Sequence, residues 1–407
     1  MSLDPTTGSN TTDIILNTDC PACGSGRVTP FYRVENVPTN SCLLFDTAEQ
    51  ARAWPRGQIV LGYCADCGFI HNMTFEQSST EYSGRYEETQ GFSPTFAQYH
   101  RDLAMRFLQR HSLHGKRVLE LGCGKGEFLL LLAELGNVIG IGVDPSARRD
   151  RIENSPYADR VTLYPEYYGP AHSDIEASAV VCKMTLEHIP DVAVFVSKLR
   201  RNLSDDRPIP VFFKIPEAER ILTDCAFEDI YYEHCSYFSE TSLARLFRHC
   251  GFNVLSVGTE YGGQYLTIEA MATKSATPEN GGTEQDMARL SKLVAAFAER
   301  VEQHKQVWRA RVHTARQQGR RVVLWGSGSK AVSFLTSLGL DDEIAAAVDI
   351  NPYRKGHYMP ATAHQIIAPE ELRDFNPGLV IVMNRIYTQE IRDTVRRLGV
   401  AAEIVAL

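Results

Sequence analysis

Residues 117–144 decide the fold of this chain: Arg117-Val-Leu-Glu-Leu-Gly-Cys-Gly-Lys-Gly126, Glu127-Phe-Leu-Leu-Leu-Leu-Ala-Glu-Leu135 and Val138-Ile-Gly-Ile-Gly-Val-Asp144. A short apolar strand leads into a glycine-rich turn, an apolar helix follows, and a second strand ends in an acid. This order is typical of the nucleotide-binding half of a doubly wound parallel sheet, which binds ligands at the carboxyl ends of its strands. The sequence therefore predicts an α/β fold.

The glycine turn has the spacing G-x-G-x-G (Gly122, Gly124, Gly126), whereas most dinucleotide sites have G-x-G-x-x-G. Glu120 precedes the turn and would repel a pyrophosphate, so we expect a ligand that has no phosphate at this point. Glycines let the backbone approach a ligand closely, and Asp144 can accept hydrogen bonds from both hydroxyls of a ribose.

Length and composition indicate a globular protein of several domains. The 407 residues suffice for two or three domains, and 43% of them are hydrophobic. No apolar run approaches the roughly 20 residues that span a bilayer, and residues 1–12 lack the pattern of a signal peptide. We therefore expect a cytoplasmic protein with no membrane contact. A net charge of -8 argues against nucleic acid as a partner.

Two pairs of cysteines have the spacing C-x-x-C: Cys20 with Cys23, and Cys64 with Cys67. In a reducing compartment, two matched pairs favour one tetrahedral zinc site over disulfides. Four thiolates leave no position for water, so the zinc would be structural and would help to fold residues 1–80. The alternative is two unligated or redox-active thiol pairs.

A second strand–glycine turn–helix unit lies in the last third of the chain, after a polar linker at residues 273–284. It reads Arg321-Val-Val-Leu-Trp-Gly-Ser-Gly-Ser-Lys330, and its second strand ends in Asp349. The turn offers backbone amides, two hydroxyls and a cation at a helix N-terminus, which suits an anion. We expect a zinc-binding β-rich domain (1–80) followed by two Rossmann-like doubly wound domains (81–275 and 285–407).

Two polar stretches between these units are candidates for a reaction site. His188 follows a buried strand, and the stretch from Asp229 to Ser239 holds Tyr231, Glu233 and His234. Such groups can move protons, and loops often carry function. The alternatives are a pocket-lining role for His188 and a structural, aromatic-rich loop whose histidine satisfies a buried carbonyl.

The residues Glu120-Leu-Gly-Cys-Gly-Lys-Gly126 together with Asp144 resemble motif I and the second-strand acid of class I S-adenosylmethionine-dependent methyltransferases. The resemblance implies that the turn packs on the methionine part of this cofactor and that the acid binds its ribose. A glycine turn of another α/β domain is the alternative. The cofactor-binding residues implied are Glu120, Gly122, Cys123, Gly124, Gly126, Asp144 and Pro145.

The order of the three domains, from Cys20 to about Ile404, resembles the sugar C-methyltransferases of deoxysugar biosynthesis, such as the thymidine-diphosphate-sugar 3-C-methyltransferases. The stretch from Asp349 to Gly356 is also similar to an element of that family. The resemblance implies a small-molecule acceptor, a nucleotide-activated keto sugar. It implies catalytic roles for His234, Tyr231, Glu233 and His188, and substrate contacts from Tyr232, Gly262, Gly263, Gly326, Gly328, Ser329, Lys330 and Asp349.

Methylation of carbon next to a ketone requires an enolate. We expect His234 to take the proton and Tyr231 to hydrogen-bond the enolate oxygen, while Glu233 orients His234 or binds a substrate hydroxyl.

Three positions depart from the family pattern. Tyr232 replaces a histidine, Met184 replaces an asparagine, and Tyr261-Gly-Gly-Gln264 stands where the family has His-Gly-Gly-Ser. All three lie where the acceptor should bind, so O- or N-methylation of a sugar or other small metabolite remains an alternative. A non-catalytic scaffold is an alternative of another class, although it would not need a complete ribose-binding set.

Overall fold

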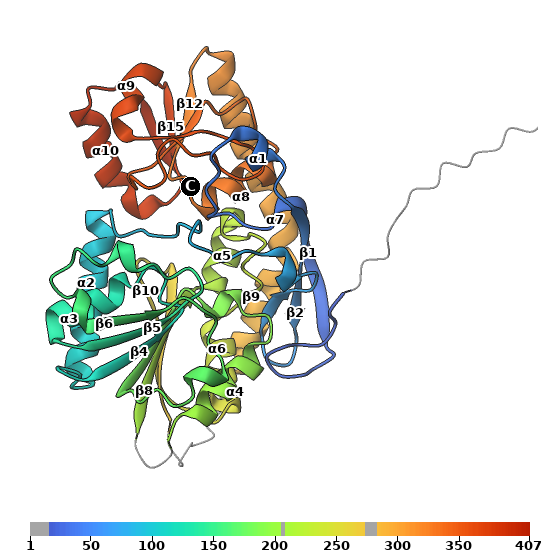
Figure 1. Ribbon diagram of the computed structural model, residues 1–407. Helices are drawn as coiled ribbons and strands as arrows, with labels where there is room; N and C mark the ends of the chain where they lie inside the picture. Colours follow the sequence, from blue (N-terminus) through green and yellow to red (C-terminus); the bar gives the residue numbers. More distant parts are fainter. Residues whose placement is uncertain (1–15, 205–207, 273–282) are drawn as a thin grey trace, which may run out of the picture.

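The computed structural model describes residues 16–204, 208–272 and 283–407. The polar residues 1–12, and the linker from 273 to 282, lie outside the described residues. The described chain forms three sheets with helices around them, and the C-terminal sheet lies above the central one in Figure 1. Two of the sheets are doubly wound, so the predicted fold class is confirmed.

The central sheet has seven strands in the order β10-β11-β8-β7-β4-β5-β6. The five strands from β8 to β6 run parallel, and the hairpin of β10 and β11 joins β8 antiparallel. The strands are β4 (Arg117–Leu121), β5 (Ile139–Val143), β6 (Val161–Tyr164), β7 (Ala179–Lys183), β8 (Ile209–Pro216), β10 (Asn253–Glu260) and β11 (Tyr265–Ala272).

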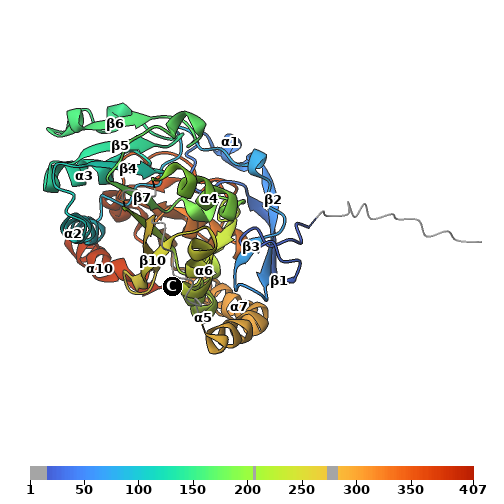
Figure 2. The same cartoon turned by 90° about the horizontal axis from the view of Figure 1, so that it is seen from below.

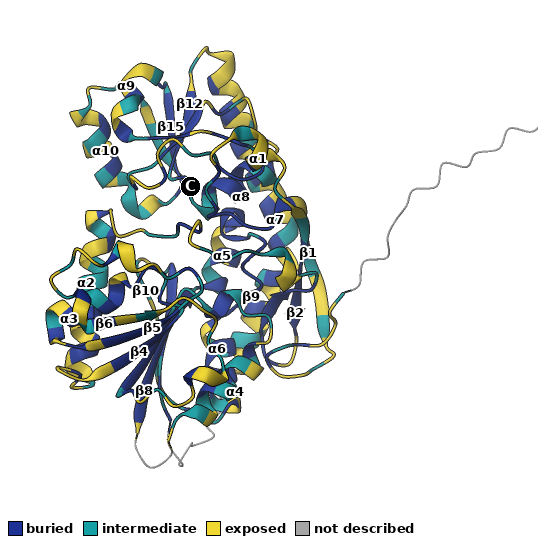
Figure 3. Ribbon diagram, viewed as in Figure 1, coloured by how far each residue is buried: buried dark blue, intermediate teal, exposed yellow. Residues whose placement is uncertain are grey.

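Helices cover both faces of the central sheet because successive strand residues point to opposite sides. Val118 and Phe212 pack against α2 and α3, whereas their neighbours Leu119 and Phe213 pack against α4 and α6. Figure 3 shows these strands buried and the outer faces of the helices exposed. The helices that cover the sheet are α2 (Pro94–Arg110), α3 (Glu127–Gly136), α4 (Val192–Asn202) and α6 (Glu240–His249), whereas α5 (Ala218–Asp224), which follows β8, packs into a separate core.

The C-terminal sheet has five parallel strands in the order β14-β13-β12-β15-β16. Leu324 packs on the side of α8, and its neighbour Val323 packs on the side of α9 and α10. The elements are β12 (Val322–Trp325), α8 (Ser329–Leu338), β13 (Ala346–Val348), β14 (Ile366–Ile367), α9 (Leu372–Phe375), β15 (Leu379–Val382), α10 (Thr388–Arg397) and β16 (Glu403–Ala406).

The N-terminal sheet takes its fourth strand from the middle of the chain. Its order is β1-β2-β3-β9, and His71 of β3 pairs with Ser236 of β9. The zinc-binding domain expected at residues 1–80 would lack this strand, because β9 comes shortly after Tyr231–His234 in the chain. The elements are β1 (Val28–Pro38), α1 (Ala48–Arg52), β2 (Arg56–Cys64), β3 (Ile70–Asn72) and β9 (Ser236–Tyr237).

The long helix α7 (Glu284–Gln317) joins the N-terminal sheet to the C-terminal domain. The ring of Phe297 lies 5.1 Å from that of Tyr32 in β1, and the apolar face of α7 shares one core with α8 and with β1 and β2. Figure 2 shows α7 beside α5. Among the described helices, none is both long and apolar enough to cross a membrane.

Candidate active site

A cavity of about 640 Å³ is lined by residues from all three parts of the chain. Its walls include the carboxyl ends of β4, β5, β7 and β8 in the central sheet, and the turns that follow β12 and β15 in the C-terminal sheet. Residues between 77 and 96 also contribute side chains. The volume is within the range of small-molecule sites.

The first glycine turn lies at this cavity with a backbone that depends on glycine. Gly122, Gly124 and Gly126 have φ angles of 66°, 52° and 83°. A Cβ atom on Gly122 would lie 1.9 Å from the hydroxyl of Thr185. Gly122, Gly124 and the intervening Cys123 line the cavity, whereas Gly126 begins α3 behind it.

Asp144 lies at the end of β5, beside this turn, and lines the cavity together with Pro145. Its Oδ2 accepts a hydrogen bond of 2.9 Å from the amide of Gly124, and its Oδ1 accepts bonds from the amide and hydroxyl of Ser146. Each oxygen can accept more than one bond, so Asp144 can hold the turn and still receive ribose hydroxyls. Glu120 is fully buried behind the turn and forms an ion pair with Lys183.

Three predicted catalytic side chains, His188, Tyr231 and His234, line the same cavity. The hydroxyl of Tyr231 lies 2.8 Å from Nε2 of His234, and the two imidazole rings meet edge to face with centroids 4.8 Å apart. Nδ1 of His188 lies 2.9 Å from the carbonyl oxygen of Glu233. The same Nδ1 also lies 2.9 Å from the hydroxyl of Tyr82. When Nδ1 carries the proton and donates it to the carbonyl, Nε2 is the acceptor nitrogen of neutral His188.

Burial keeps this group uncharged at neutral pH. Burial and the neighbouring His188 lower the pKa of His234 well below its ordinary value, and burial lowers the pKa of His188 to about 4. Burial raises the pKa of Tyr231 far above the ordinary phenol value. The cavity thus has two imidazoles able to accept a proton and a phenol able to donate a hydrogen bond.

Glu233 is buried, and the structure places its carboxylate among N-terminal residues outside the cavity wall. It accepts hydrogen bonds from the side chain of Asn40 (2.9 Å), from the amide and hydroxyl of Ser41, and from the hydroxyl of Tyr86. Burial raises the pKa of Glu233 to about 7. Its contacts fix the loop to the N-terminal region.

Three residues predicted to bind substrate also lie outside the cavity wall. Tyr232 points into the N-terminal sheet, where its hydroxyl accepts a 3.0 Å hydrogen bond from the amide of Glu76. Gly262 and Gly263 form the tight turn between β10 and β11. Gln264, the next residue, does line the cavity.

The second glycine turn supplies the opposite wall through Gly326, Gly328, Ser329, Lys330 and Asp349. Nζ of Lys330 lies 2.7 Å from a carboxylate oxygen of Asp229, so the cation expected to bind an anion already has a partner.

Sequence reasoning missed several residues of the wall. Lys214 is buried in β8 with Nζ 4.2 Å from the ring centre of Tyr265, and burial lowers the pKa of Lys214 to about 7. A lysine inside an apolar strand is a signal that could have identified it. Tyr82, Tyr86 and Glu88 come from a segment without periodicity, which offers no such signal.

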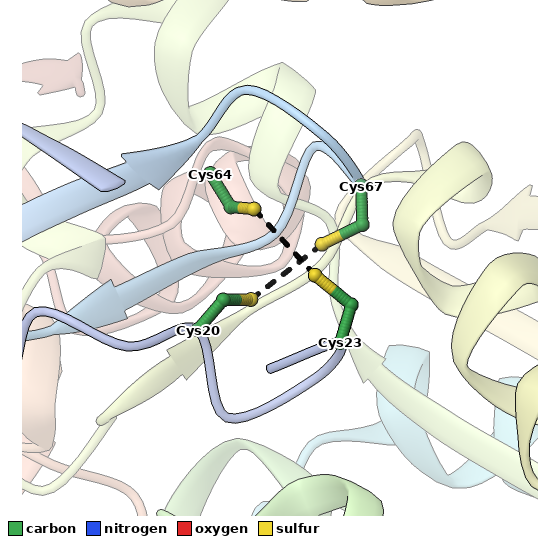
Figure 4. Close-up of side chains that lie close together, drawn as sticks. All are labelled: Cys20, Cys23, Cys64 and Cys67. Atoms are coloured by element: carbon green, nitrogen blue, oxygen red, sulfur yellow. Dashed lines mark hydrogen bonds between the residues drawn. The ribbon is translucent and has the colours of Figure 1, made fainter. Parts of the chain in front are cut away.

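The four cysteines of the C-x-x-C pairs lie together, as Figure 4 shows. The Sγ atoms of Cys20 and Cys67 are 3.6 Å apart, and those of Cys23 and Cys64 are 3.7 Å apart. Four thiolates about 2.3 Å from a central zinc would be about 3.8 Å apart, whereas a disulfide brings two sulfurs to about 2.05 Å. The donor set and spacing therefore fit a tetrahedral metal site.

Comparison with known proteins agrees with this architecture. One family model, described as a methyltransferase domain, matches residues 95–257, and another, a C-methyltransferase C-terminal domain, matches residues 273–402. The C-methyltransferase NovU of Streptomyces niveus is 25% identical over 325 residues, which cover 76% of each chain.

Other relatives match a shorter part of the chain. The ribosomal protein L11 methyltransferase of Aeromonas hydrophila is 33% identical over 112 residues, covering 26% of this chain and 36% of its own. A crystal structure of magnesium protoporphyrin IX methyltransferase from Synechocystis PCC 6803 aligns with a TM-score of 0.35 and 16% identity, over 44% of this chain and 84% of that one. The two family models and the C-methyltransferase relative carry the assignment: the chain is an S-adenosylmethionine-dependent methyltransferase, with a methyltransferase domain followed by a C-methyltransferase C-terminal domain.

Proposed function

We propose that this enzyme methylates a carbon atom of a nucleotide-activated keto sugar by way of an enolate. The observation that carries the proposal is the continuous cavity, which reaches from the first glycine turn, past His188, Tyr231 and His234, to the second glycine turn. Such a space can receive a cofactor at one end and an acceptor with a sugar and a nucleotide at the other.

The cofactor end fits S-adenosylmethionine. Gly122, Cys123 and Gly124 would hold its methionine part, while Asp144 and Pro145 would hold the adenosine. Bound there, the cofactor supplies a methyl group on a sulfonium centre that a carbon nucleophile can accept. A ketone acidifies the hydrogen on its neighbouring carbon, so the protein must supply a base for that proton and a donor for the enolate oxygen.

His234 is the proposed base. It is neutral and lines the cavity, and Tyr231 lies at its Nε2. When the hydroxyl of Tyr231 turns to donate a hydrogen bond to the developing enolate oxygen, Nε2 becomes free to take the proton from carbon. His188 is the second candidate, because its Nε2 is the acceptor nitrogen of a ring fixed through Nδ1.

We also propose that Cys20, Cys23, Cys64 and Cys67 bind one structural zinc ion. The distances between their sulfur atoms support this proposal. The ion would stabilise the N-terminal sheet, and that sheet includes β9, the strand that follows the residues of the reaction site.

Methylation of oxygen or nitrogen on a sugar or other small metabolite is the second candidate. The observation that favours it is the presence of Met184 and Gln264 in the cavity wall, at positions where the sugar C-methyltransferases have asparagine and serine. These side chains differ in size and hydrogen bonding, so they can change which acceptor atom faces the methyl group.

Proton exchange in deuterium oxide tests the proposal without the cofactor. Thymidine- and uridine-diphosphate 4-keto-6-deoxy sugars are incubated with the protein, and the signal of the hydrogen at C3 is followed by NMR. We expect the protein to accelerate its loss. No exchange with either sugar, together with transfer of a ¹³C-labelled methyl group to oxygen or nitrogen, would favour the second candidate.

Calorimetric titration with S-adenosylmethionine is the accompanying control. We expect binding. The absence of binding at millimolar cofactor would contradict both the methylation of carbon and the methylation of oxygen or nitrogen.

A further inference from the structure

A carboxyl group with no role in the reaction described above lies behind the two histidines. Glu187 belongs to the short 3-10 helix Leu186–His188 and is 1% exposed. One of its oxygens and one nitrogen each of His188 and His234 all lie within 4.8 Å of one another. His188 and His234 line the cavity, and Glu187 lies behind them, outside its wall.

Three atoms of this cluster lack a hydrogen-bond partner. Among the described residues, none hydrogen-bonds to either carboxylate oxygen of Glu187 or to Nδ1 of His234, and all three atoms are buried. Leaving a buried polar group unpaired costs about 1–3 kcal/mol, so such groups usually find partners or serve a function. A carboxylate and an imidazole N–H are complementary, and an oxygen of Glu187 and a ring nitrogen of His234 lie within 4.8 Å of each other.

The two nitrogens of His234 face different surroundings. Nε2 lies at the hydroxyl of Tyr231, on the cavity side, while Nδ1 is buried and unpartnered. A base that uses Nε2 must have its proton on Nδ1, and an adjacent carboxylate both selects that tautomer and stabilises the imidazolium that forms.

We propose that Glu187 is a positioning residue for His234: its carboxylate accepts the Nδ1 proton, so that Nε2 is free to receive a proton from substrate. The inference rests on the proposed function. In the step, the C–H bond beside the ketone breaks, its electron pair remains as the enolate, and the proton passes to Nε2. Glu187 stays ionised and offsets the charge of the imidazolium.

The surroundings of Glu187 set the pH at which it can act. Burial raises its pKa to about 8, while nearby backbone amides, which do not reach hydrogen-bonding geometry, and the charge of Lys214 favour its ionised form. The carboxylate therefore gains its charge as the pH rises through about 8, and turnover should rise with it. The other titratable groups that face it are His188, His234, Tyr82, Cys182, Tyr231, Cys235 and Tyr265.

Glu187→Gln tests the inference by turnover against pH. We expect kcat to fall about 10²–10⁴-fold, with KM changed less than threefold, and the rise of kcat near pH 8 to disappear. Glu187→Asp should restore part of the activity. Glu217→Gln is the matched control: Glu217 is also a buried carboxyl whose pKa burial raises to about 7, but its oxygens cap α5. An unchanged pH profile in Glu187→Gln would overturn the proposal.

NMR of ¹⁵N-histidine in the protein without substrate separates this inference from the proposed function. In the wild type above pH 8.5, His234 should carry its proton on Nδ1, and in Glu187→Gln it should populate both tautomers. Identical spectra would overturn the inference whatever the substrate. So would metal analysis that found a second metal ion in the wild type and its loss in Glu187→Gln, because the cluster would then be a metal site.

Discussion

The two glycine turns of this enzyme are built in the same way and have different surroundings. In each, the acid that ends the following strand accepts a hydrogen bond from an amide of the turn: Asp144 from Gly124, and Asp349 from Ser327, both at 2.9 Å. In each, the other carboxylate oxygen accepts from the amide two residues further on. The acid therefore stabilises the turn in both domains.

The two turns differ in the side chains that contact them. At the second turn, the guanidinium of Arg354 lies 3.1 Å from the carbonyl of Ser327, and Lys330 forms an ion pair with Asp229. Asp229 stands two residues before Tyr231, so this ion pair joins the second turn to the loop that carries Tyr231 and His234. The first turn lines the cavity through Gly122, Cys123 and Gly124. The same supersecondary unit thus has different neighbours in the two domains, and we expect these neighbours to decide whether it binds the cofactor or supports the loop that carries Tyr231.

Removal of zinc should have the largest effect on folding and turnover. It separates the contribution of the N-terminal sheet from that of the first glycine turn. A structural zinc site contributes about 10–16 kcal/mol to the folding of small modules. Without zinc, the N-terminal sheet, including β9, should lose its order, and turnover should vanish. Because the first turn belongs to the central sheet, S-adenosylmethionine should still bind within about threefold of its original affinity.

Mass-spectrometric metal analysis and calorimetry check this prediction. Protein purified without chelator should hold one zinc per chain, Cys64→Ser should lose it, and the control Cys250→Ser should keep it. Far less than one zinc in the wild type would contradict the assignment.

His234→Gln should have the next largest effect, and it leaves both turns intact. Removing a general base lowers turnover about 10²–10⁴-fold, while cofactor affinity should not change. Proton exchange at the acceptor carbon should stop in His234→Gln and continue in the control His313→Gln, which alters an exposed residue of α7. Exchange that persists in His234→Gln would place the base elsewhere, with His188 next.

Replacing the two acids compares the turns directly. Asp144→Ala should weaken binding of S-adenosylmethionine by about 2–4 kcal/mol, because a charged acceptor for two hydroxyls is lost. Asp349→Ala should change the affinity less than twofold. Calorimetric titration of both variants measures this, and equal losses would show that the second turn also contributes to cofactor binding.

Lys330→Met should have the smallest effect, a decrease in the free energy of unfolding. Burial opposes ionisation of Asp229, but Lys330 and Arg220 outweigh it and lower its pKa below the ordinary value. A lowered acid pKa stabilises the fold above about pH 4, its unfolded value, and less as the pH falls further. Arg220 remains in the variant, so we expect a loss of about 1–2 kcal/mol at pH 7.

Urea unfolding at pH 7 and at pH 3.5 checks this prediction. The difference between wild type and Lys330→Met should shrink at the lower pH, and equal midpoints at pH 7 would show that the pair does not stabilise the fold.

Local sequence patterns predicted both doubly wound sheets. Apolar runs that end in glycine or in an acid identify strands and turns, because their pattern follows from backbone geometry and burial. The C-x-x-C spacing likewise led to the cysteine cluster. The partners of Glu233 could not be predicted this way, since Asn40 and Ser41 are nearly two hundred positions away and meet it only through tertiary packing. Tyr232 points away from the cavity for the same reason, because β9 turns the loop toward the N-terminal sheet.

The pairing of β3 with β9 has a consequence for how the protein is made. As the chain leaves the ribosome, residues 16–72 emerge early, but their sheet lacks an edge partner until Ser236 and Tyr237 follow. Most of the central domain must therefore be synthesised before the first module can be completed. A chaperone that shields the exposed edge of β3 during this interval would protect the part of the chain most open to wrong strand pairing.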